Sequence, residues 1–175
     1  MKTIQIKERP KLKTSELLQL CRDKFPVWSY LSDEELDKQF PAPEKATSRI
    51  FLDSIEPDKE TLGKSVQEAD PNQKGITFRE RIIMELEYFK KTGNHLDIKG
   101  ATFCSGSRNA DGYVPGCYWY GGKFRVDWYY LGHSYSDYGV RSAVALDSFS
   151  FNPEPDIEKA IEIVKQAGYK IIKEI

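Results

Sequence analysis

The chain has 175 residues, 39 % of them hydrophobic, which is enough for one domain with a buried core. Lys and Arg number 26 and Asp and Glu 27, so the net charge is −1. A nearly neutral chain has no long-range field to attract nucleic acid or an anionic membrane, and its partners must be recognised by local contacts.

The first residues, MKTIQIKERPKLK, carry charges where a signal peptide has its apolar centre, and no apolar run approaches the length of a membrane span. We therefore expect a cytoplasmic protein with no membrane partner. The three cysteines, Cys21, Cys104 and Cys117, are widely spaced and odd in number, which predicts free buried thiols rather than a disulfide framework or a zinc site. Cys104 and Cys117 could still pair in an oxidising setting.

Residues 1–55 are predicted to form an N-terminal helical segment. Residues 3–7 suit a short edge strand, and Thr14 can cap a helix whose apolar residues recur at helical spacing until Pro26. Ser32 and Glu35 have the spacing of a capping box, which predicts a second helix up to residue 40.

Residues 56–75 are rich in charge, Pro and Gly, which is typical of a linker or a mobile loop. An α+β domain is predicted over residues 76–175. It opens with the clearest helix of the chain, in which Thr77 and Glu80 form a capping box and Gly93 ends the helix.

A β-hairpin is predicted from residue 117 to residue 130, because Gly121-Gly122 supplies the positive φ angles of a tight turn. A further strand is expected over residues 139–146, a helix from Asp156 and a closing strand over residues 169–175. The predicted fold is therefore α+β, with a small antiparallel, hairpin-rich sheet flanked by helices.

The two histidines, His95 and His133, are not joined by any zinc-protease spacing, and the aspartates lack the regular intervals of a calcium loop. We expect no metal and no other cofactor. His95 follows a helix end, where capping is the favoured interpretation. Residues 106–112 are similar to a phosphate-binding loop but lack its lysine, so a turn with Asp111-Gly112 at its tip is favoured.

One alternative is a small enzyme that uses His133, Asp137, Arg108 or Cys104 in a cleft beside the hairpin, with Cys104 or Cys117 as a nucleophile. A buried His133 near a carboxylate or thiol would favour that alternative. An exposed His133 at a loop tip would argue against it, and we predict no catalytic residue.

The composition between Tyr113 and Tyr138 is the strongest functional signal. Seven of the ten tyrosines and two of the three tryptophans lie there, interleaved with Gly, Ser, Asp and His. This mixture is typical of binding surfaces such as antibody paratopes. The alternative is that the aromatics fill a core, as in a scaffold protein. That alternative is favoured for Trp119, Phe124 and Trp128 and stays open for most of the tyrosines.

Two stretches resemble known modules. The run RERIIMELEYFKKTGNHLDIKGATFCSGSRNADGYVPGCYW resembles a recurring bacterial and phage-type module, which implies no function. The run GCYWYGGKFRVDWYYLGHSYSDYGVRSAVAL resembles the end of the C-type-lectin-fold domains of variable proteins from diversity-generating retroelements.

The second resemblance implies a C-type-lectin-like fold that binds ligands noncovalently, with Val140 and Arg141 as framework. The calcium-binding signature of sugar-binding lectins is absent, so calcium-dependent carbohydrate binding is not implied. Because basic residues are sparse among the rings, the expected partner is a protein or another macromolecule rather than nucleic acid. The implied ligand-binding residues are Tyr118, Tyr120, Tyr129, Tyr130, His133, Tyr135, Asp137 and Tyr138.

Overall fold

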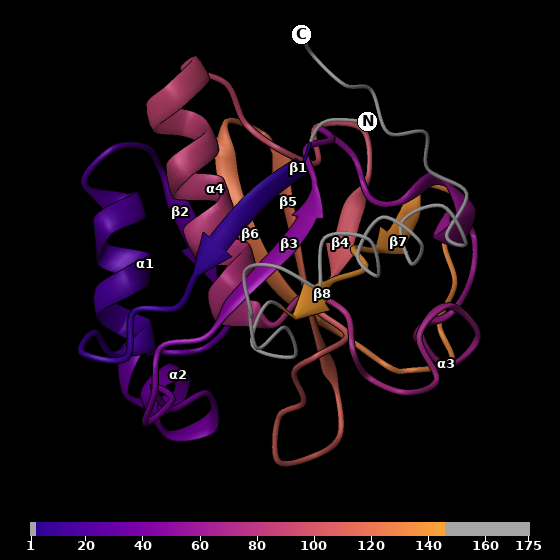
Figure 1. Cartoon of the computed structure of the whole chain (residues 1–175), viewed down its shortest axis with the longest axis horizontal. Helices are drawn as coiled ribbons and strands as arrows, with labels where there is room; N and C mark the ends of the chain where they lie inside the picture. Colours follow the sequence, from indigo (N-terminus) through magenta and orange to yellow (C-terminus); the bar gives the residue numbers. More distant parts are fainter. Residues whose placement is uncertain (1–2, 146–175) are drawn as a thin grey trace, which may run out of the picture.

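The structure is a computed structural model that describes residues 3–145. It is a mixed α and β fold with a three-stranded sheet, order β1-β3-β8, and a five-stranded sheet, order β2-β6-β5-β4-β7 (Figure 1). The helix predicted from Asp156 and the strand predicted over residues 169–175 lie outside the described residues. The helices are α1 (Thr14–Arg22), α2 (Asp33–Gln39), the short 3-10 helix η1 (Lys59–Thr61), α3 (Val66–Ala69) and α4 (Phe78–Thr92). The strands are β1 (Thr3–Lys7), β2 (Val27–Ser29), β3 (Ser48–Leu52), β4 (Ala101–Phe103), β5 (Val114–Tyr120), β6 (Lys123–Tyr129), β7 (Tyr138–Val140) and β8 (Val144–Ala145).

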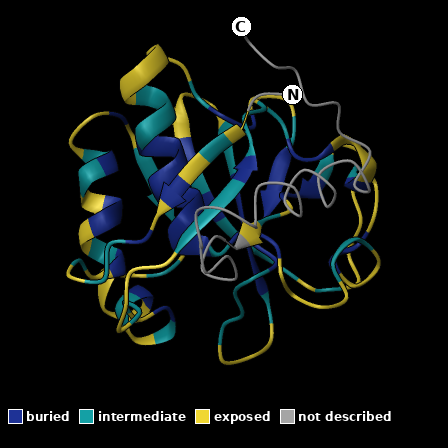
Figure 2. Ribbon diagram, in the orientation of Figure 1, coloured by how far each residue is buried: buried dark blue, intermediate teal, exposed yellow. Residues whose placement is uncertain are grey.

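Helix α4 is the centre of the fold. Its predicted capping box is confirmed, since the Thr77 hydroxyl accepts from the Glu80 amide and the Glu80 carboxylate accepts from the Thr77 amide. Gly93 ends the helix with a φ of +70°, the left-handed conformation that glycine adopts without strain. Every residue from Phe78 to Leu86 is buried, and only the last turn is exposed (Figure 2).

The N-terminal elements pack directly on α4. The capping box of α2 at Ser32 and Glu35 and the edge strand β1 are confirmed. Helix α1 differs at its start, because Lys13 and not Thr14 occupies the N-cap position. The Thr14 hydroxyl instead donates to the carbonyl of Phe40, so this side chain ties α1 to the end of α2.

The hairpin of β5 and β6 is confirmed, with Gly121 and Gly122 at φ +60° and +73° in the turn. This pair of positive angles is the geometry of the two-residue turn that matches the twist of the strands. The predicted side-chain alternation also holds. Phe124 and Val126 are fully buried on one face of β6, and Arg125 and Asp127 lie on the other.

The prediction of an antiparallel sheet holds only for its central strands. The outer pairs, β2 with β6 and β4 with β7, are parallel. The strand predicted over residues 139–146 is instead two strands, because β7 belongs to the five-stranded sheet and β8 to the three-stranded one. The chain passes from one sheet to the other at Arg141. The Arg141 side chain is buried inside the molecule.

Residues on both sides of the segment 56–75 share one buried cluster. Leu17, Leu36 and Phe51 from the N-terminal part lie in it together with Ile82 and Val126. The segment itself holds η1 and α3, and the Thr61 hydroxyl accepts from the Val140 amide at 3.0 Å. It therefore packs on β7 rather than extending as a linker. No helix within residues 3–145 combines the length and the apolar character that a membrane crossing needs.

Candidate binding surface

The five-stranded sheet has two unlike faces. On the face toward α1 and α4, Cys117, Phe124 and Val126 belong to the main core. On the other face, β5 and β6 present polar and aromatic side chains that are half-buried or exposed, including Tyr118 opposite Arg125 across the hairpin. This second face holds most of the residues predicted to bind a ligand.

A small second core supports the rings on this face. It consists of Val66 from α3, Phe103 from β4, Val114 from β5 and Val140 from β7. The Phe103 ring lies edge-on at 5.4 Å from the Tyr129 ring and 5.5 Å from the Tyr138 ring. Apolar contacts with this second core thus hold the tyrosine rings of β6 and β7 in position.

From these two tyrosines a continuous set of ring contacts runs outward over the loop between β6 and β7. Tyr138 lies 4.7 Å from Tyr135, and Tyr135 lies 6.2 Å from His133 between ring centroids. His133 in turn lies 5.2 Å from Tyr130. We call this set the tyrosine cluster: Tyr113, Tyr118, Tyr129, Tyr130, His133, Tyr135 and Tyr138.

The inner members of the cluster are held by their hydroxyl groups as well as by their rings. The hydroxyls of Tyr129 and Tyr138 are 3.4 Å apart, and the Tyr118 hydroxyl donates to the Asp127 carboxylate at 3.3 Å. Burial is the main cause that raises the pKa of Tyr129 and Tyr118 above the ordinary tyrosine value. These phenols therefore remain protonated at neutral pH and act as hydrogen-bonding groups.

The outer members are open to solvent. Tyr130 is 57 % exposed and Tyr135 is 43 % exposed, and His133 is also exposed. Tyr113, 4.4 Å from Tyr130, extends the cluster toward the start of β5. The cluster thus combines fixed inner rings with accessible outer rings.

A second group, which we call the arginine stack, lies at the turn end of the hairpin. The Arg125 guanidinium lies 5.5 Å from the centroid of the Trp28 ring and 5.5 Å from that of the Tyr120 ring. Its Nε also donates to the Tyr120 carbonyl at 3.3 Å. Tyr120 is 67 % exposed, so the stack offers both a cation and an aromatic ring to a partner.

Comparisons with protein-family models, with curated proteins and with solved structures found no match.

Most of the predicted ligand-binding residues lie together in the structure. Tyr118, Tyr129, Tyr130, His133, Tyr135 and Tyr138 are all members of the tyrosine cluster, and Tyr120 belongs to the arginine stack. Asp137 is exposed in the loop before β7, and within the described residues its carboxylate forms no ion pair or hydrogen bond.

The predicted ligand-binding residues leave out four contributors to this surface: Trp28, which lies outside the stretch from 113 to 138, and Tyr113, Arg125 and Asp127, which lie within it. Trp28 comes from β2, a three-residue parallel strand that carries no alternation signal of its own. Arg125 and Asp127 were placed on the correct face of the hairpin, and their spacing from the tyrosines across the strands could have identified them.

The alternative enzyme site is not assembled. Cys104 is fully buried on the helix side of the sheet, with its Sγ 3.8 Å from that of Cys117, and burial raises its thiol pKa. His133 and Asp137 are exposed in a loop on the other side, and Arg108 lines a separate pocket. Within residues 3–145, no three His, Cys, Asp or Glu side chains are grouped to hold a metal ion.

The prediction that His95 caps a helix is wrong. Its ring stacks on Trp119 with centroids 3.3 Å apart, and its Nδ1 lies 2.8 Å from Glu85. Glu85 also accepts from Arg81, whose guanidinium donates to Asp97. His95 is therefore the outer end of a buried charge network, and Gly93 ends the helix without it.

Proposed function

We propose that this protein is a noncovalent binding module that holds a protein partner on the tyrosine cluster and the arginine stack. The observation that carries the proposal is the unbroken set of ring contacts from buried Phe103 to exposed Tyr130. Side chains already held in position lose little conformational freedom on binding, so more of the contact energy appears as affinity.

The chemistry of the surface favours a protein over a polyanion. Tyrosine hydroxyls and the His133 ring donate and accept hydrogen bonds, while the ring faces supply apolar area. Arg125 is the cation of the stack, and the net charge of the whole chain is −1. Tyr, Trp and Arg are the residue types that dominate the energetics of protein interfaces.

We also propose that the module resembles the C-type-lectin-fold variable proteins in displaying diversified side chains on a fixed framework. The burial of Val140 and Arg141, each 1 % exposed, supports a framework role for that pair. The test is to sequence this locus in many individuals of its source population. Variation confined to the ring positions between 113 and 138, with Gly121, Phe124 and Val126 constant, would support diversification. An invariant stretch would refute it.

Binding itself can be tested with a phage-displayed peptide library selected on the immobilised full-length protein. We expect recovered peptides to bind the protein saturably in a fluorescence-polarisation titration. The variant Y120S/Y130S/Y135S should weaken binding by at least about tenfold, because exposed aromatic anchors carry most of the energy of such contacts. These three side chains are exposed, so their replacement should leave the fold intact.

The matched control is Val144→Ala. Val144 is 57 % exposed on β8 of the other sheet, so this variant removes an exposed apolar side chain away from the proposed surface. We expect it to bind like the unaltered protein. Peptides that bind the triple variant as tightly as the unaltered protein, or a selection that recovers no binding peptide, would contradict the proposal.

A further inference from the structure

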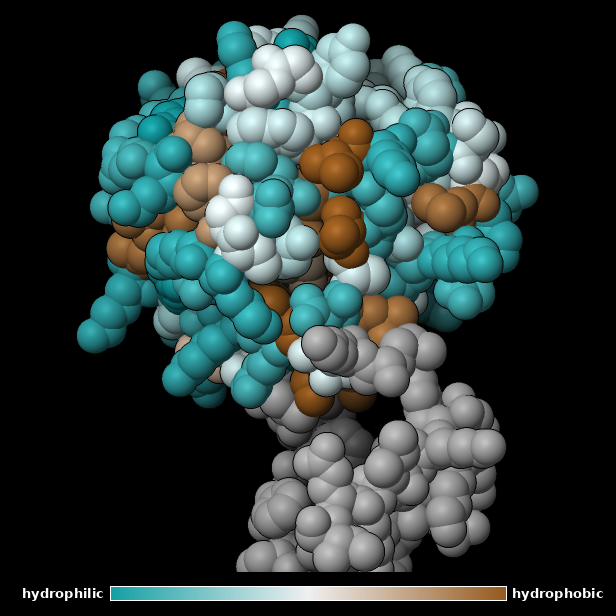
Figure 3. Space-filling model, turned by 90° about the horizontal axis from the view of Figure 1, so that it is seen from above, coloured by the Kyte–Doolittle hydropathy of each residue, from teal (hydrophilic) through white to brown (hydrophobic). Residues whose placement is uncertain are grey.

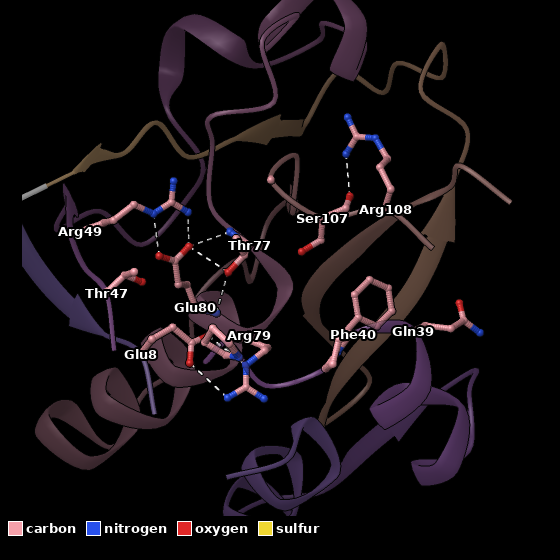
Figure 4. A pocket seen from close by; sticks show the side chains of 13 residues that line it. Glu8, Gln39, Phe40, Thr47, Arg49, Thr77, Arg79, Glu80, Ser107 and Arg108 are labelled. Carbon is pink, nitrogen blue, oxygen red and sulfur yellow. Dashed lines mark hydrogen bonds and ion pairs between the residues drawn. The ribbon is translucent and has the colours of Figure 1, made fainter. Parts of the chain in front are cut away.

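A pocket with a volume of 540 Å³ lies on the helix side of the molecule, between the end of α2, the start of α4 and the loop after β4 (Figure 4). Phe40, which lines it, stacks on Trp128 at 5.4 Å. Trp128 lies on the core face of β6, opposite the arginine and tyrosine side chains. The pocket is therefore separate from the proposed protein-binding surface, and its volume is typical of small-molecule sites.

Two of the three arginines that line the pocket form ion pairs with carboxylates. Arg79 donates from Nε to Glu8 at 3.0 Å, and its two other nitrogens donate to Thr14, Glu8 and backbone carbonyls. Arg49 donates from Nε to Glu80 at 2.6 Å and to the carbonyls of residues 74 and 75. The charge of each of these two arginines is therefore already compensated by a carboxylate.

Arg108 is different. Its Nη1 donates to the carbonyls of Ser105 and Ser107 at 2.7 and 2.6 Å, which fixes the guanidinium. Its Nε is buried and has no hydrogen-bond partner within residues 3–145, and no carboxylate there forms an ion pair with it. Burial lowers the pKa of Arg108 and outweighs the opposing effect of the Asp70 charge, so Asp70 compensates this half-buried cation only in part.

Among residues 3–145 Nη2 has no hydrogen-bond partner either, and it shares one edge of the guanidinium with Nε. Nε is closed off from solvent and Nη1 is occupied by carbonyls, so Nη2 is the donor that a ligand can reach, and it can bind an oxygen of a carboxylate. Nearby, the Ser107 hydroxyl accepts from the Phe78 amide at 2.9 Å and keeps its own proton free to donate. Phe40, Pro41 and Pro43 form an apolar wall, and the buried Oε1 of Gln39 also lacks a partner within the described residues.

The geometry points to a binding site for a carboxylate that carries an apolar group, with Arg108 as the anion receptor and Phe40, Pro41 and Pro43 as the apolar contact. Such a group occurs in small organic acids and at the C-terminus of a peptide chain. The site does not depend on the proposed protein-binding surface, and either can fail without the other.

The probe is phenylacetate, titrated into the full-length ¹⁵N-labelled protein while the arginine Nε–Hε signals are followed by NMR. We expect a saturable shift of the Arg108 signal, with at least about tenfold weaker binding of acetate, which lacks the apolar group, and of inorganic phosphate. Arg108→Gln should weaken phenylacetate binding by at least about tenfold, followed there through backbone amide signals of residues 105–107. Arg108→Lys should weaken it as well, because a single ammonium group cannot bond both serine carbonyls and also present a second nitrogen to the ligand.

The matched control is Arg22→Gln, which removes an arginine from an exposed ion pair with Asp33 and should leave phenylacetate binding unchanged.

An N-acetylated peptide ending in phenylalanine, with a free or an amidated C-terminus, distinguishes the two sources of the carboxylate, a small organic acid and the C-terminus of a peptide chain. Binding of the free form alone assigns a chain terminus, and binding of phenylacetate without the peptide assigns a small acid. No saturable shift, equal binding of phosphate, or unchanged binding in Arg108→Gln would overturn the proposal.

Discussion

Asp97 is the residue on which the buried charges of this fold converge. Its carboxylate accepts from Arg81, from the Thr102 hydroxyl and from Arg141, and all four side chains are almost fully buried. Arg141 also donates to the Ser54 and Ile55 carbonyls, so the network joins α4, β4 and the chain between the two sheets. A buried arginine is tolerated only when its charge is compensated in this way.

We expect Asp97→Asn to lower the free energy of unfolding by about 3–5 kcal/mol, because two guanidinium groups would lose their shared counter-charge inside the core. Urea titration followed by circular dichroism measures the change. Asp33→Asn is the control, since Asp33 forms an exposed ion pair with Arg22 and should cost less than about 1 kcal/mol. Equal costs for the two variants would show that the network does not stabilise the fold.

The buried thiol of Cys21 gives the fold a dependence on alkaline pH. Burial, with a smaller contribution from the charge of Glu85, raises its pKa from 9.0 to about 12. Between these two values the unfolded chain has lost the thiol proton and the folded chain has kept it. Stability is therefore full below pH 9 and falls as the pH rises toward the folded value.

For one such thiol the expected loss is about 1.4 kcal/mol per pH unit above pH 9. The measurement is the free energy of unfolding at several pH values from about 8 to about 11, which begins below the ordinary thiol pKa and stays below the raised one. Cys21→Ala should be less stable below pH 9, because it leaves a cavity, and the difference should shrink above pH 9, because the slope of the variant is shallower by about that amount. Identical slopes would mean that Cys21 ionises equally in both states.

At the scale of elements, the position of Tyr129 depends on the glycine across the strand pair. The Tyr129 ring covers Gly116 of β5, where an added Cβ would collide with the ring. A strand glycine of this kind allows close approach of another group. The hairpin thereby supports the inner part of the tyrosine cluster.

Gly116→Ala is expected to displace the Tyr129 ring and to cost about 1–3 kcal/mol through overpacking. Near-ultraviolet circular dichroism reports the tyrosine environment, and urea titration reports the stability. Gly122→Asn is the comparison: it sits at φ +73° with no atom within 4 Å of an added Cβ, and asparagine tolerates that conformation. It should cost less than about 1 kcal/mol. A tolerated Gly116→Ala with an unchanged spectrum would contradict this account.

At the scale of the whole molecule, one face of the surface is mostly polar. The face seen from above in Figure 3 is largely hydrophilic, with hydrophobic side chains in small, separate groups. The main core draws on β1, α1, α2 and β3 as well as on α4 and β6. The N-terminal half therefore contributes to the same buried cluster as the hairpin.

Deletion of residues 1–75 tests whether the N-terminal half is a separate unit. We expect the remainder to lose cooperative unfolding, because the deletion removes β2 from the edge of the five-stranded sheet and exposes the apolar side of α4. Adding the separate 1–75 fragment should restore a cooperative transition in urea. A sharp transition of residues 76–175 alone would instead support the three-part division expected from the composition.

The sequence by itself determined the elements whose signals are local. Capping boxes at Ser32 and Thr77 and the Gly121-Gly122 turn depend on residues within a few positions of one another, and all three were predicted correctly. The mixed α and β class and the sidedness of β6 followed from the same local periodicity. The sequence also showed directly that most of the tyrosines lie in one stretch of the chain, from Tyr113 to Tyr138.

Only the tertiary structure decided those features that depend on contacts between residues far apart in the sequence. The strands β2, β3 and β4 are short and were not predicted, because their hydrogen bonds come from residues far along the chain. The same applies to Arg141, whose buried partners lie between residues 54 and 102, and to His95, which was predicted as a cap. Local spacing cannot report which charges will meet inside a core, since that depends on how the sheets and α4 pack together.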